Sequence, residues 1–143
     1  MGVKIDIELM EGGVAPQYQT AGSAGMDLCC SEAFEISPME RKGVPTGVKI
    51  ALPEGYEAQV RPRSGLAIKH GISMVNTPGT IDSDYRGEIR VILINLGQEV
   101  VRFEKGDRVA QIVVAPVTRA EWNPVTELDQ TDRGAGGFGS TGK

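Results

Sequence analysis

Short segments in which apolar and polar residues alternate constrain this chain more than any other feature of its sequence. Neighbouring side chains of a β-strand point to opposite faces, so a period of two predicts half-buried strands. The clearest examples are residues 3–7, 48–52 and 56–61. Turn residues follow at short intervals, at 11–13, 45–47, 53–55, 77–79, 96–98 and 105–107. Many short strands with frequent turns predict an all-β sandwich or barrel.

Two segments depart from this alternation, because residues 89–94 and 109–114 are apolar on both faces. A strand of that kind needs two covers. One cover is the facing sheet, and we expect the other to be a second subunit. Helix signals are weak, and the best candidate is a single turn over residues 65–70. The sequence therefore predicts a self-associating β domain with little helix.

The whole-chain properties exclude several functional classes. A length of 143 residues predicts one domain, and the net charge of −4 argues against a broad basic surface for nucleic acid. No segment approaches the roughly 18 apolar residues of a membrane helix. A disulfide between the adjacent Cys29 and Cys30 would be strained, so we expect free thiols and a cytoplasmic protein. Only His70 could join them on a metal, which is too few ligands for structural zinc.

The C-terminal segment from Arg133 onward is rich in glycine and contains one aromatic residue, Phe138. Glycine loses the most backbone freedom on ordering, and little apolar surface is present to offset that loss. The segment is therefore either a flexible tail without a role or a lid that orders on a ligand. Its arginine and backbone amides suit phosphates, although the pattern is neither a P-loop nor a dinucleotide fingerprint.

Two polar segments interrupt the strands in the first half of the chain. Asp27 stands in the otherwise apolar segment 24–28, as a site carboxylate or as a turn or edge residue. Segment 61–66 combines two arginines with Ser64 and Gly65. The planar guanidinium group suits phosphate oxygens, and a Ser-Gly pair offers a hydroxyl and backbone N–H groups to an anion. Surface arginines beside a turn are the alternative.

A third polar segment, residues 76–87, has turn residues at both ends and is interpreted as a hairpin. Its backbone groups can imitate a base-pairing partner, and Asn76 adds a side-chain amide. Asp82 is a potential general base, and Tyr85 offers a flat surface to a sugar or ring. Strand parity places Asp82 and Asp84 on one side and Tyr85 on the other, unless the turn rotates them. A turn alone leaves the tyrosine unexplained.

Together these segments resemble the trimeric dUTP diphosphatases, or dUTPases, whose five motifs are matched in order. The matches are AGMDL at 24–28, RPRSGLAIKHGI at 61–72, NTPGTIDSDYRGEI at 76–89, GDRVAQIV at 106–113 and RGAGGFGSTG at 133–142. The resemblance implies an all-β, jelly-roll-like β-barrel or sandwich that assembles as a homotrimer. It also implies a single domain over 1–143, with a barrel core at 1–125. Residues 126–143 would be a flexible Gly-rich arm that closes as a lid over a neighbouring subunit's site.

The activity implied by the resemblance is hydrolysis of dUTP to dUMP and pyrophosphate, with Mg²⁺ and an aspartate base that directs water to the α-phosphorus. This reaction keeps uracil out of DNA and supplies dUMP for dTMP synthesis. The implied partners are the nucleotide and the other subunits of the homotrimer, with no nucleic acid and no membrane. The alternatives are a dCTP deaminase of the same fold, which lacks the IDSDYRG segment in this form, or a nucleotide-binding regulatory protein.

The resemblance also implies a role for each motif residue. Asp82 would be the catalytic base, with Gln111 near the attacking water and the phosphates, and Asp27 would contact the water shell of a magnesium ion held mainly by the triphosphate. The residues implied to hold phosphates are Arg63, Ser64, Gly65, Arg133, Ser140 and Thr141. The residues implied to bind the nucleoside are Asn76, Gly79, Ile81, Tyr85, Phe138 and Gly139. In this scheme the uracil pocket rejects a 5-methyl group, and Tyr85 rejects a 2′-hydroxyl.

Overall fold

Eleven short strands and one helix make up the regular structure of residues 2–142, the part of the chain that this computed structural model describes. The helix is α1 (Ser64–His70). The strands are β1 (Asp6–Leu9), β2 (Met26–Cys29), β3 (Phe34–Ile36), β4 (Arg41–Pro45), β5 (Val48–Ala51), β6 (Tyr56–Arg61), β7 (Ile72–Met74), β8 (Gly79–Ile81), β9 (Arg90–Asn95), β10 (Val101–Phe103) and β11 (Arg108–Pro116).

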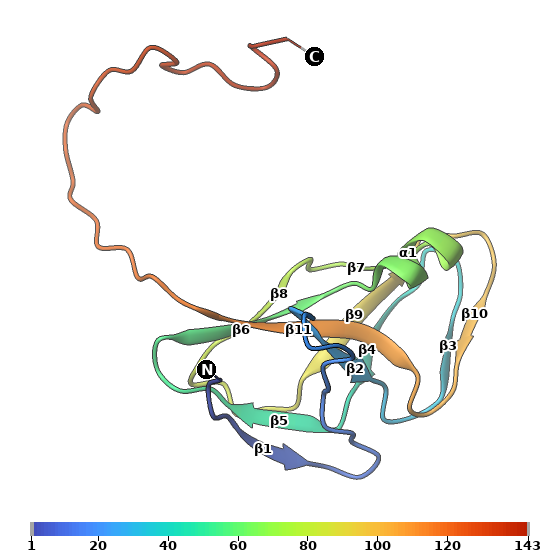
Figure 1. Cartoon of the computed structure of the whole chain (residues 1–143). Coiled ribbons are helices and arrows are strands. Elements are labelled where there is room, and N and C mark those ends of the chain that lie inside the picture. The colour runs from blue at the N-terminus through green and yellow to red at the C-terminus, as the bar shows by residue number, and fades with distance from the viewer. Residues whose placement is uncertain (1, 143) are drawn as a thin grey trace.

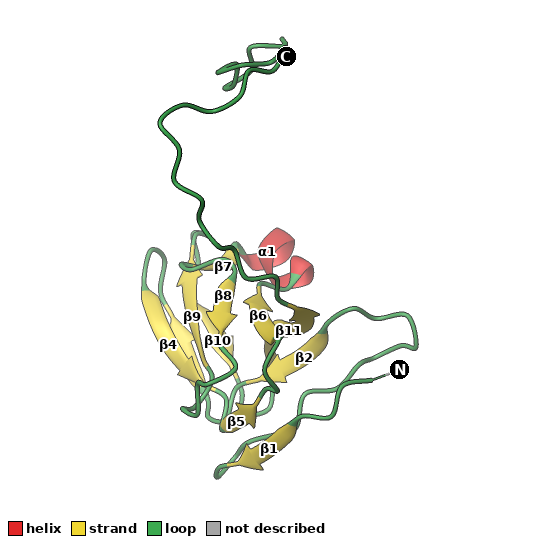
Figure 2. Ribbon diagram, turned by 90° about the vertical axis from the view of Figure 1, so that its left-hand side faces the viewer, coloured by secondary structure: helices red, strands yellow, loops and turns green. Residues whose placement is uncertain are grey.

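The strands form antiparallel sheets that enclose one core (Figure 2). The larger sheets have the strand orders β2-β11-β6-β8 and β4-β9-β7, and the pairs β1-β5 and β10-β3 complete the barrel. Buried side chains from both larger sheets pack together in the core, among them Leu28 and Ile112 from one sheet and Val91 and Leu93 from the other. The β2-β11-β6-β8 sheet matters most for the site, because its outer face carries polar motif residues.

The period-two prediction is confirmed where a strand lies inside a large sheet. In β6, Ala58 and Val60 are buried while the side chains between them face outward. The predicted turns at Gly55 and Gly106 are confirmed by backbone φ values of 89° and 90°, a region that favours glycine. The two-sided apolar strands β9 and β11 bury one face and leave the other half-buried.

Three local predictions need correction. Of the predicted strand 3–7, only Ile5 is half-buried, because β1 begins at Asp6, is exposed in all four of its residues and pairs with β5 at the rim. Residues 76–87 are not a hairpin, since β7 before them pairs with β9 whereas β8 pairs with β6 in the other large sheet. The expected single helical turn is a seven-residue helix, which ends at Gly71 in the left-handed conformation.

The chain leaves the barrel after β11, which ends at Pro116 (Figure 1). Val117 still donates its N–H to the carbonyl of Gly55, and residues 118–135 are exposed throughout. Within residues 2–142, no helix combines the length and the apolar character that crossing a bilayer requires.

Candidate active site

A β-bulge in β11 brings two motif residues onto the same outer face of the sheet. Opposite β2, Arg108 pairs with Cys29, Ala110 with Leu28 and Gln111 with Asp27, so Val109 is an extra residue in the ladder. Val109 and Ala110 are consecutive and both buried. Strand parity alone would put Arg108 and Gln111, three positions apart, on opposite faces. The bulge instead lets both face outward beside Asp27.

The carboxylate of Asp27 lies between two guanidinium groups. Arg63 Nε is 3.5 Å from Oδ1 and Arg108 Nη1 is 3.4 Å from Oδ2. Arg63 also donates a 3.3 Å hydrogen bond to the carbonyl of Arg108. The side chain of Asp27 is 17% exposed, so this carboxylate is partly shielded from water. Two cations around one anion leave an excess positive charge, which suits a phosphate chain.

The adjoining start of α1 presents backbone N–H groups next to this arginine cluster. The first helical hydrogen bond runs from Ala67 N to Arg63 O at 3.0 Å, and no side chain caps the helix. The N–H groups of Ser64, Gly65 and Leu66 precede that bond and have no partner inside the helix. Open space surrounds the Cα of Gly65, so a ligand can approach its backbone closely.

Gln111 is held in place on the same face. Its Nε2 donates a 3.0 Å hydrogen bond to the carbonyl of Pro62. A side chain at Gly25 would collide with it, because a Cβ there would lie 2.6 Å from Gln111 Oε1. The glycine before Asp27 in the sequence therefore leaves room for the glutamine of a distant motif.

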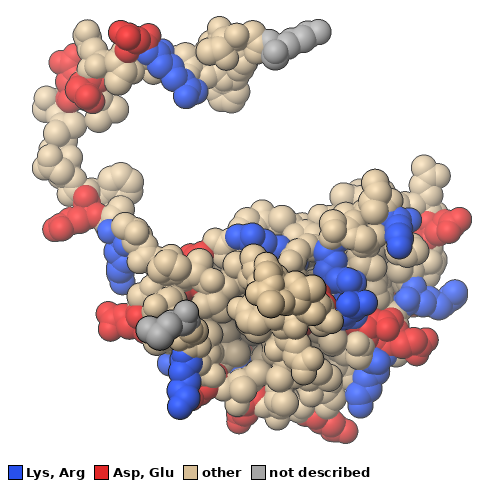
Figure 3. All heavy atoms as spheres, in the orientation of Figure 1, with Lys and Arg blue, Asp and Glu red and all other residues tan. Residues whose placement is uncertain are grey.

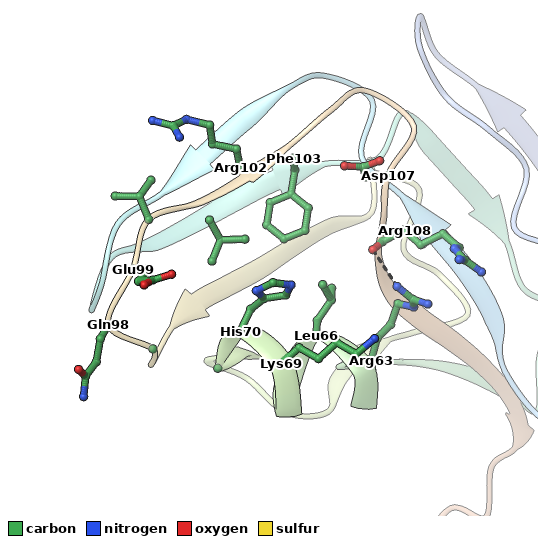
Figure 4. A pocket seen from close by; sticks show the side chains of 14 residues that line it. Arg63, Leu66, Lys69, His70, Gln98, Glu99, Arg102, Phe103, Asp107 and Arg108 are labelled. Atoms are coloured by element: carbon green, nitrogen blue, oxygen red, sulfur yellow. Dashed lines mark hydrogen bonds between the residues drawn. The ribbon is translucent and has the colours of Figure 1, made fainter.

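A cleft of about 730 Å³ continues from the arginine cluster between α1 and the segment 97–103 (Figure 4). Figure 4 shows Lys69 and His70 on the helix side and Arg102 on the strand side. His70 is exposed and lines this cleft. The basic lining is local, since acidic and basic side chains are mixed over the barrel face seen in Figure 3.

A second pocket, of about 390 Å³, collects the predicted nucleoside-binding residues of the barrel. It opens between the edge strand β8 and the β4-β9-β7 sheet. Its lining includes Asn76, Gly79, Ile81, Asp82 and Tyr85. The volume lies within the range of about 300–1,000 Å³ that is usual for small-molecule sites.

The turn after β8 rotates the side chains that strand parity would separate. Tyr85 N donates to Asp82 O at 3.2 Å, which closes the turn. Asp82 and Tyr85 consequently line the same pocket, whereas Asp84 lines a different cavity on the far side of the turn, which Asp82 also borders. The turn therefore rotates these side chains, which is the exception that the parity expectation allowed, because a tight turn does not keep a period of two.

The arm residues predicted to join the site lie apart from both pockets in the protomer (Figure 1). The hydrogen bonds of residues 131–142 join residues of that same segment, for example Arg133 Nε to Gly136 O at 2.7 Å. Phe138 is fully exposed. The remaining predicted residues, Gly139, Ser140 and Thr141, are also exposed.

The structure therefore brings the predicted residues together in three separate groups. Asp27, Arg63 and Gln111 form one group with the start of α1, the nucleoside pocket forms the second, and the arm forms the third. Sequence reasoning missed Arg108, which contacts Asp27. The signal was available, because Arg108 belongs to the same GDRVAQIV motif as Gln111, but only the bulge shows that its side chain reaches the site.

The two thiols are free and stay protonated near neutral pH. Burial raises the pKa of Cys29 above its ordinary value, and the Asp27 carboxylate raises it further against the lowering effect of Arg108 and Arg63. Burial also raises the pKa of Cys30, whose Sγ donates to the carbonyl of Glu104 at 3.1 Å. Among the described residues, no cluster of three or more His, Cys, Asp or Glu side chains could hold a metal ion by itself.

Comparison with solved structures defines the class of fold. The chain superimposes on a dUTPase of Staphylococcus bacteriophage 80alpha, solved with dUPNHPP, with a TM-score of 0.91 and 25% sequence identity. The match covers 98% of this chain and 99% of the phage protein. A mutant of the same phage dUTPase matches with a TM-score of 0.90 and 26% identity, over 98% of this chain and 99% of its own. The predicted jelly-roll-like β fold is thereby confirmed.

The family follows from the sequence comparisons. The family model for dUTPase matches residues 12–142, and the chain belongs to this family. A deoxyuridine 5'-triphosphate nucleotidohydrolase of Wolinella succinogenes is 61% identical over 96% of this chain and 92% of its own length. A protein of the same name from Fusobacterium nucleatum is 53% identical over 99% of this chain and 98% of its own length.

Proposed function

We propose that this protein hydrolyses dUTP to dUMP and pyrophosphate, which keeps uracil out of DNA and supplies dUMP for dTMP synthesis. Family membership and the shared name of relatives at 61% and 53% identity support this reaction. The observation that carries the proposal at the level of the site is the presence of Asp82 and Tyr85 in one pocket. A carboxylate beside a nucleoside-sized pocket can direct water to a phosphorus atom next to the sugar.

The phosphate chain is assigned to the first group of residues. Arg63 supplies charge, while Ser64 and Gly65 supply the hydroxyl and backbone N–H groups at the start of α1. Arg108 adds a second guanidinium group on the same carboxylate. Charge neutralisation of this kind stabilises the negative charge that three phosphates concentrate in one place.

The nucleoside is assigned to the second pocket. Asn76 and the backbone around Gly79 and Ile81 would hydrogen-bond the uracil edge, in a space too small for the methyl group of thymine. Tyr85 would pack against the deoxyribose and leave no room for a 2′-hydroxyl. The tyrosine ring lines this pocket while 44% of its surface stays exposed, so it is available to a ligand.

Asp82 is assigned as the general base that positions and deprotonates the attacking water, with Gln111 near that water. A general base contributes typically about 10²- to 10⁴-fold to a rate. Positioning of the water and charge neutralisation by the arginines must supply the rest. Gln111 is suited to a positioning role because its amide group is fixed by Pro62.

Magnesium is the metal that family membership implies, and the residues present fit it only as an outer shell. Mg²⁺ typically keeps several waters and binds substrate phosphates with few protein carboxylates. The Asp27 pairs at 3.4 and 3.5 Å are longer than the roughly 2.8 Å of a tight charged hydrogen bond, which leaves oxygen lone pairs for a bound water. When bound, the ion would neutralise phosphate charge.

The functional unit is proposed to be a homotrimer with three composite sites. The separation of the three residue groups in one protomer supports this arrangement, because no single subunit assembles a whole site. The segment after β11 also carries apolar side chains that need a cover, since Trp122, Val125 and Leu128 are 89%, 57% and 80% exposed. We assign residues 1–125 to the barrel and 126–143 to an arm that covers a neighbouring subunit's site.

We also propose that the protein is located in the cytoplasm, and its two free thiols are in keeping with that location.

Product analysis tests the reaction. The purified protein is incubated with Mg²⁺ and with dUTP, dTTP, UTP or dCTP separately, and nucleotides and pyrophosphate are quantified. We expect dUMP and pyrophosphate from dUTP alone. Conversion of dCTP to a uracil nucleotide would favour the deaminase, and binding of dUTP without turnover would favour a regulatory protein.

A further inference from the structure

Gly87 stands where a side chain would collide with the ring of Tyr85. A Cβ placed on Gly87 would meet the tyrosine Oη and would lie 2.6 Å from Cζ and 3.0 Å from Cε1. Separations below 3.0 Å are essentially never found for real Cβ atoms, so the ring could not keep its place. The ring therefore lies directly against the backbone of its own loop.

The backbone conformation does not explain the glycine. The glycines with a left-handed φ include Gly47, Gly55 and Gly106, and Gly87 is not among them. The φ of Gly87 therefore does not by itself require a glycine. Contact with the tyrosine ring is thus the specific reason for a glycine at this position.

Hydrogen bonds hold the ring and its loop from the other sides. Tyr85 Oη donates to Glu88 O at 2.9 Å, and Arg86 Nη1 donates to Ser83 O at 2.7 Å and to Tyr85 O at 3.0 Å. The carboxylate of Glu88 accepts a 2.9 Å hydrogen bond from Gly47 N. This last bond ties the loop to the turn between β4 and β5, so the loop itself is anchored to the barrel.

We propose that Gly87 is a positioning residue that sets sugar specificity through Tyr85. The inference rests on the proposed function, in which Tyr85 packs against the deoxyribose. The missing side chain lets the ring lie flat against the loop, at the depth where a deoxyribose fits and a 2′-hydroxyl does not. Any larger residue forces the ring to rotate and breaks its hydrogen bond to Glu88, so the fit to deoxyribose and the rejection of ribose are lost together.

The fold itself should tolerate the change. Tyr85 is 44% exposed, so its ring can rotate toward solvent, and the φ of Gly87 is not in the left-handed region that favours glycine. A Gly87→Ala variant should therefore keep its melting temperature within a few degrees of the wild type. A purely structural glycine would show the opposite pattern, with loss of stability and an equal loss of activity on every nucleotide.

A double-mutant cycle tests the inference. The variants are Gly87→Ala, Tyr85→Ala and the double variant, with Gly22→Ala as a control because a Cβ at Gly22 meets no atom within 4 Å. For each, kcat/KM is measured with dUTP and UTP, and binding of dUMP and UMP is measured by calorimetry. If Tyr85→Ala abolishes turnover, the affinities for dUMP and UMP still allow the variants to be compared.

We expect Gly87→Ala to reduce the dUTP-to-UTP ratio of kcat/KM and the dUMP-to-UMP affinity ratio by at least about tenfold. In the Tyr85→Ala background the same substitution should change either ratio by less than about twofold, because residues that act through one another are not additive. Gly22→Ala should match the wild type.

The contrary results separate the two proposals. If the wild type prefers dUTP over UTP and Gly87→Ala keeps that preference, the positioning role of Gly87 is wrong and the proposed function stands. The same conclusion holds if Gly87→Ala has its full effect without the tyrosine ring. If the wild type discriminates between deoxyribose and ribose neither in turnover nor in binding, the proposed function and the inference are both wrong.

Discussion

The barrel and the C-terminal arm contribute to the proposed site in opposite ways. The barrel residues are fixed by contacts inside one protomer, as with Asp27 between two arginines and Gln111 on the carbonyl of Pro62. The arm residues, as far as residue 142, form hydrogen bonds only with one another. Ordering a backbone costs roughly 1–2 kcal/mol per residue, so a glycine-rich arm needs new contacts before it holds one place. The barrel part of the site is therefore preorganised, whereas the proposed closure of the arm requires contacts with a ligand and a neighbouring subunit.

The largest effect is expected from removing the proposed base, Asp82, from the preorganised barrel part of the site. Asp82→Asn keeps the shape of the side chain and removes its charge, so we expect kcat to fall by at least about 10²-fold with little change in dUTP binding. Single-turnover kinetics and calorimetry measure the two quantities. Asp84→Asn is the matched control, because Asp84 lies in the same turn but lines only the other cavity. Nearly full turnover by Asp82→Asn would remove Asp82 from the role.

Deleting residues 133–143 removes most of the C-terminal arm. We expect turnover to fall about 10²-fold, since the deletion takes away an arginine, an aromatic cover and several backbone N–H groups. The melting temperature should stay close to that of the intact protein, because the described part of the deleted segment, residues 133–142, makes no hydrogen bond to the barrel. Calorimetry and steady-state kinetics decide the matter. Loss of the thermal transition would show that the arm is structural instead.

Asp27→Asn probes the ion pairs that hold the preorganised half together. We expect kcat/KM for dUTP to fall about tenfold, and the Mg²⁺ concentration for half-maximal rate to rise, because a neutral amide orders the bound water shell less well. A magnesium titration with each variant measures both effects. Asp6→Asn on the exposed strand β1 serves as the control. An unchanged magnesium dependence would contradict the outer-shell role.

The smallest expected effect concerns the barrel alone and appears as a pH dependence of stability. The pKa of Cys30 is raised by burial, so the folded state holds this proton more tightly than the unfolded state. Its contribution is fully present below the unfolded pKa of about 8.5 and is lost as pH rises through the folded value. Cys30→Ala should therefore show a shallower loss of unfolding free energy between about pH 8 and pH 10. Denaturant titrations at several pH values measure it, and equal slopes would refute the assignment.

Sequence reasoning succeeded where a signal is local. The alternation in 56–61 and the turn glycines predict their elements correctly, because a strand face and a left-handed turn are set by neighbouring residues. It failed where distant strands decide the outcome. The pairing of β8 with β6 and the exposure of β1 depend on which strands meet, and no feature of residues 76–87 or 3–7 specifies that.

The same contrast between local and distant signals applies to the candidate site. Motif matching placed Asp82 and Tyr85 in one segment, but only the turn geometry explains how both reach one pocket. The roles of Arg108 and Gly87 were not predicted, for a related reason. The first depends on a bulge and the second on a ring packed over its backbone, and both are three-dimensional facts about residues that look ordinary in the sequence.

The extra residue in β11 has a consequence for protein engineering. A graft of residues 108–111 onto another antiparallel barrel would have to keep the bulge, because a regular strand that holds the same four residues would turn one of the two polar side chains into the hydrophobic interior. Deletion of Val109 would instead place Arg108 and Gln111 two positions apart, so that a regular strand would keep both on the outer face. The extra residue thus keeps apolar side chains on the inner face and polar side chains on the outer face on both sides of the bulge.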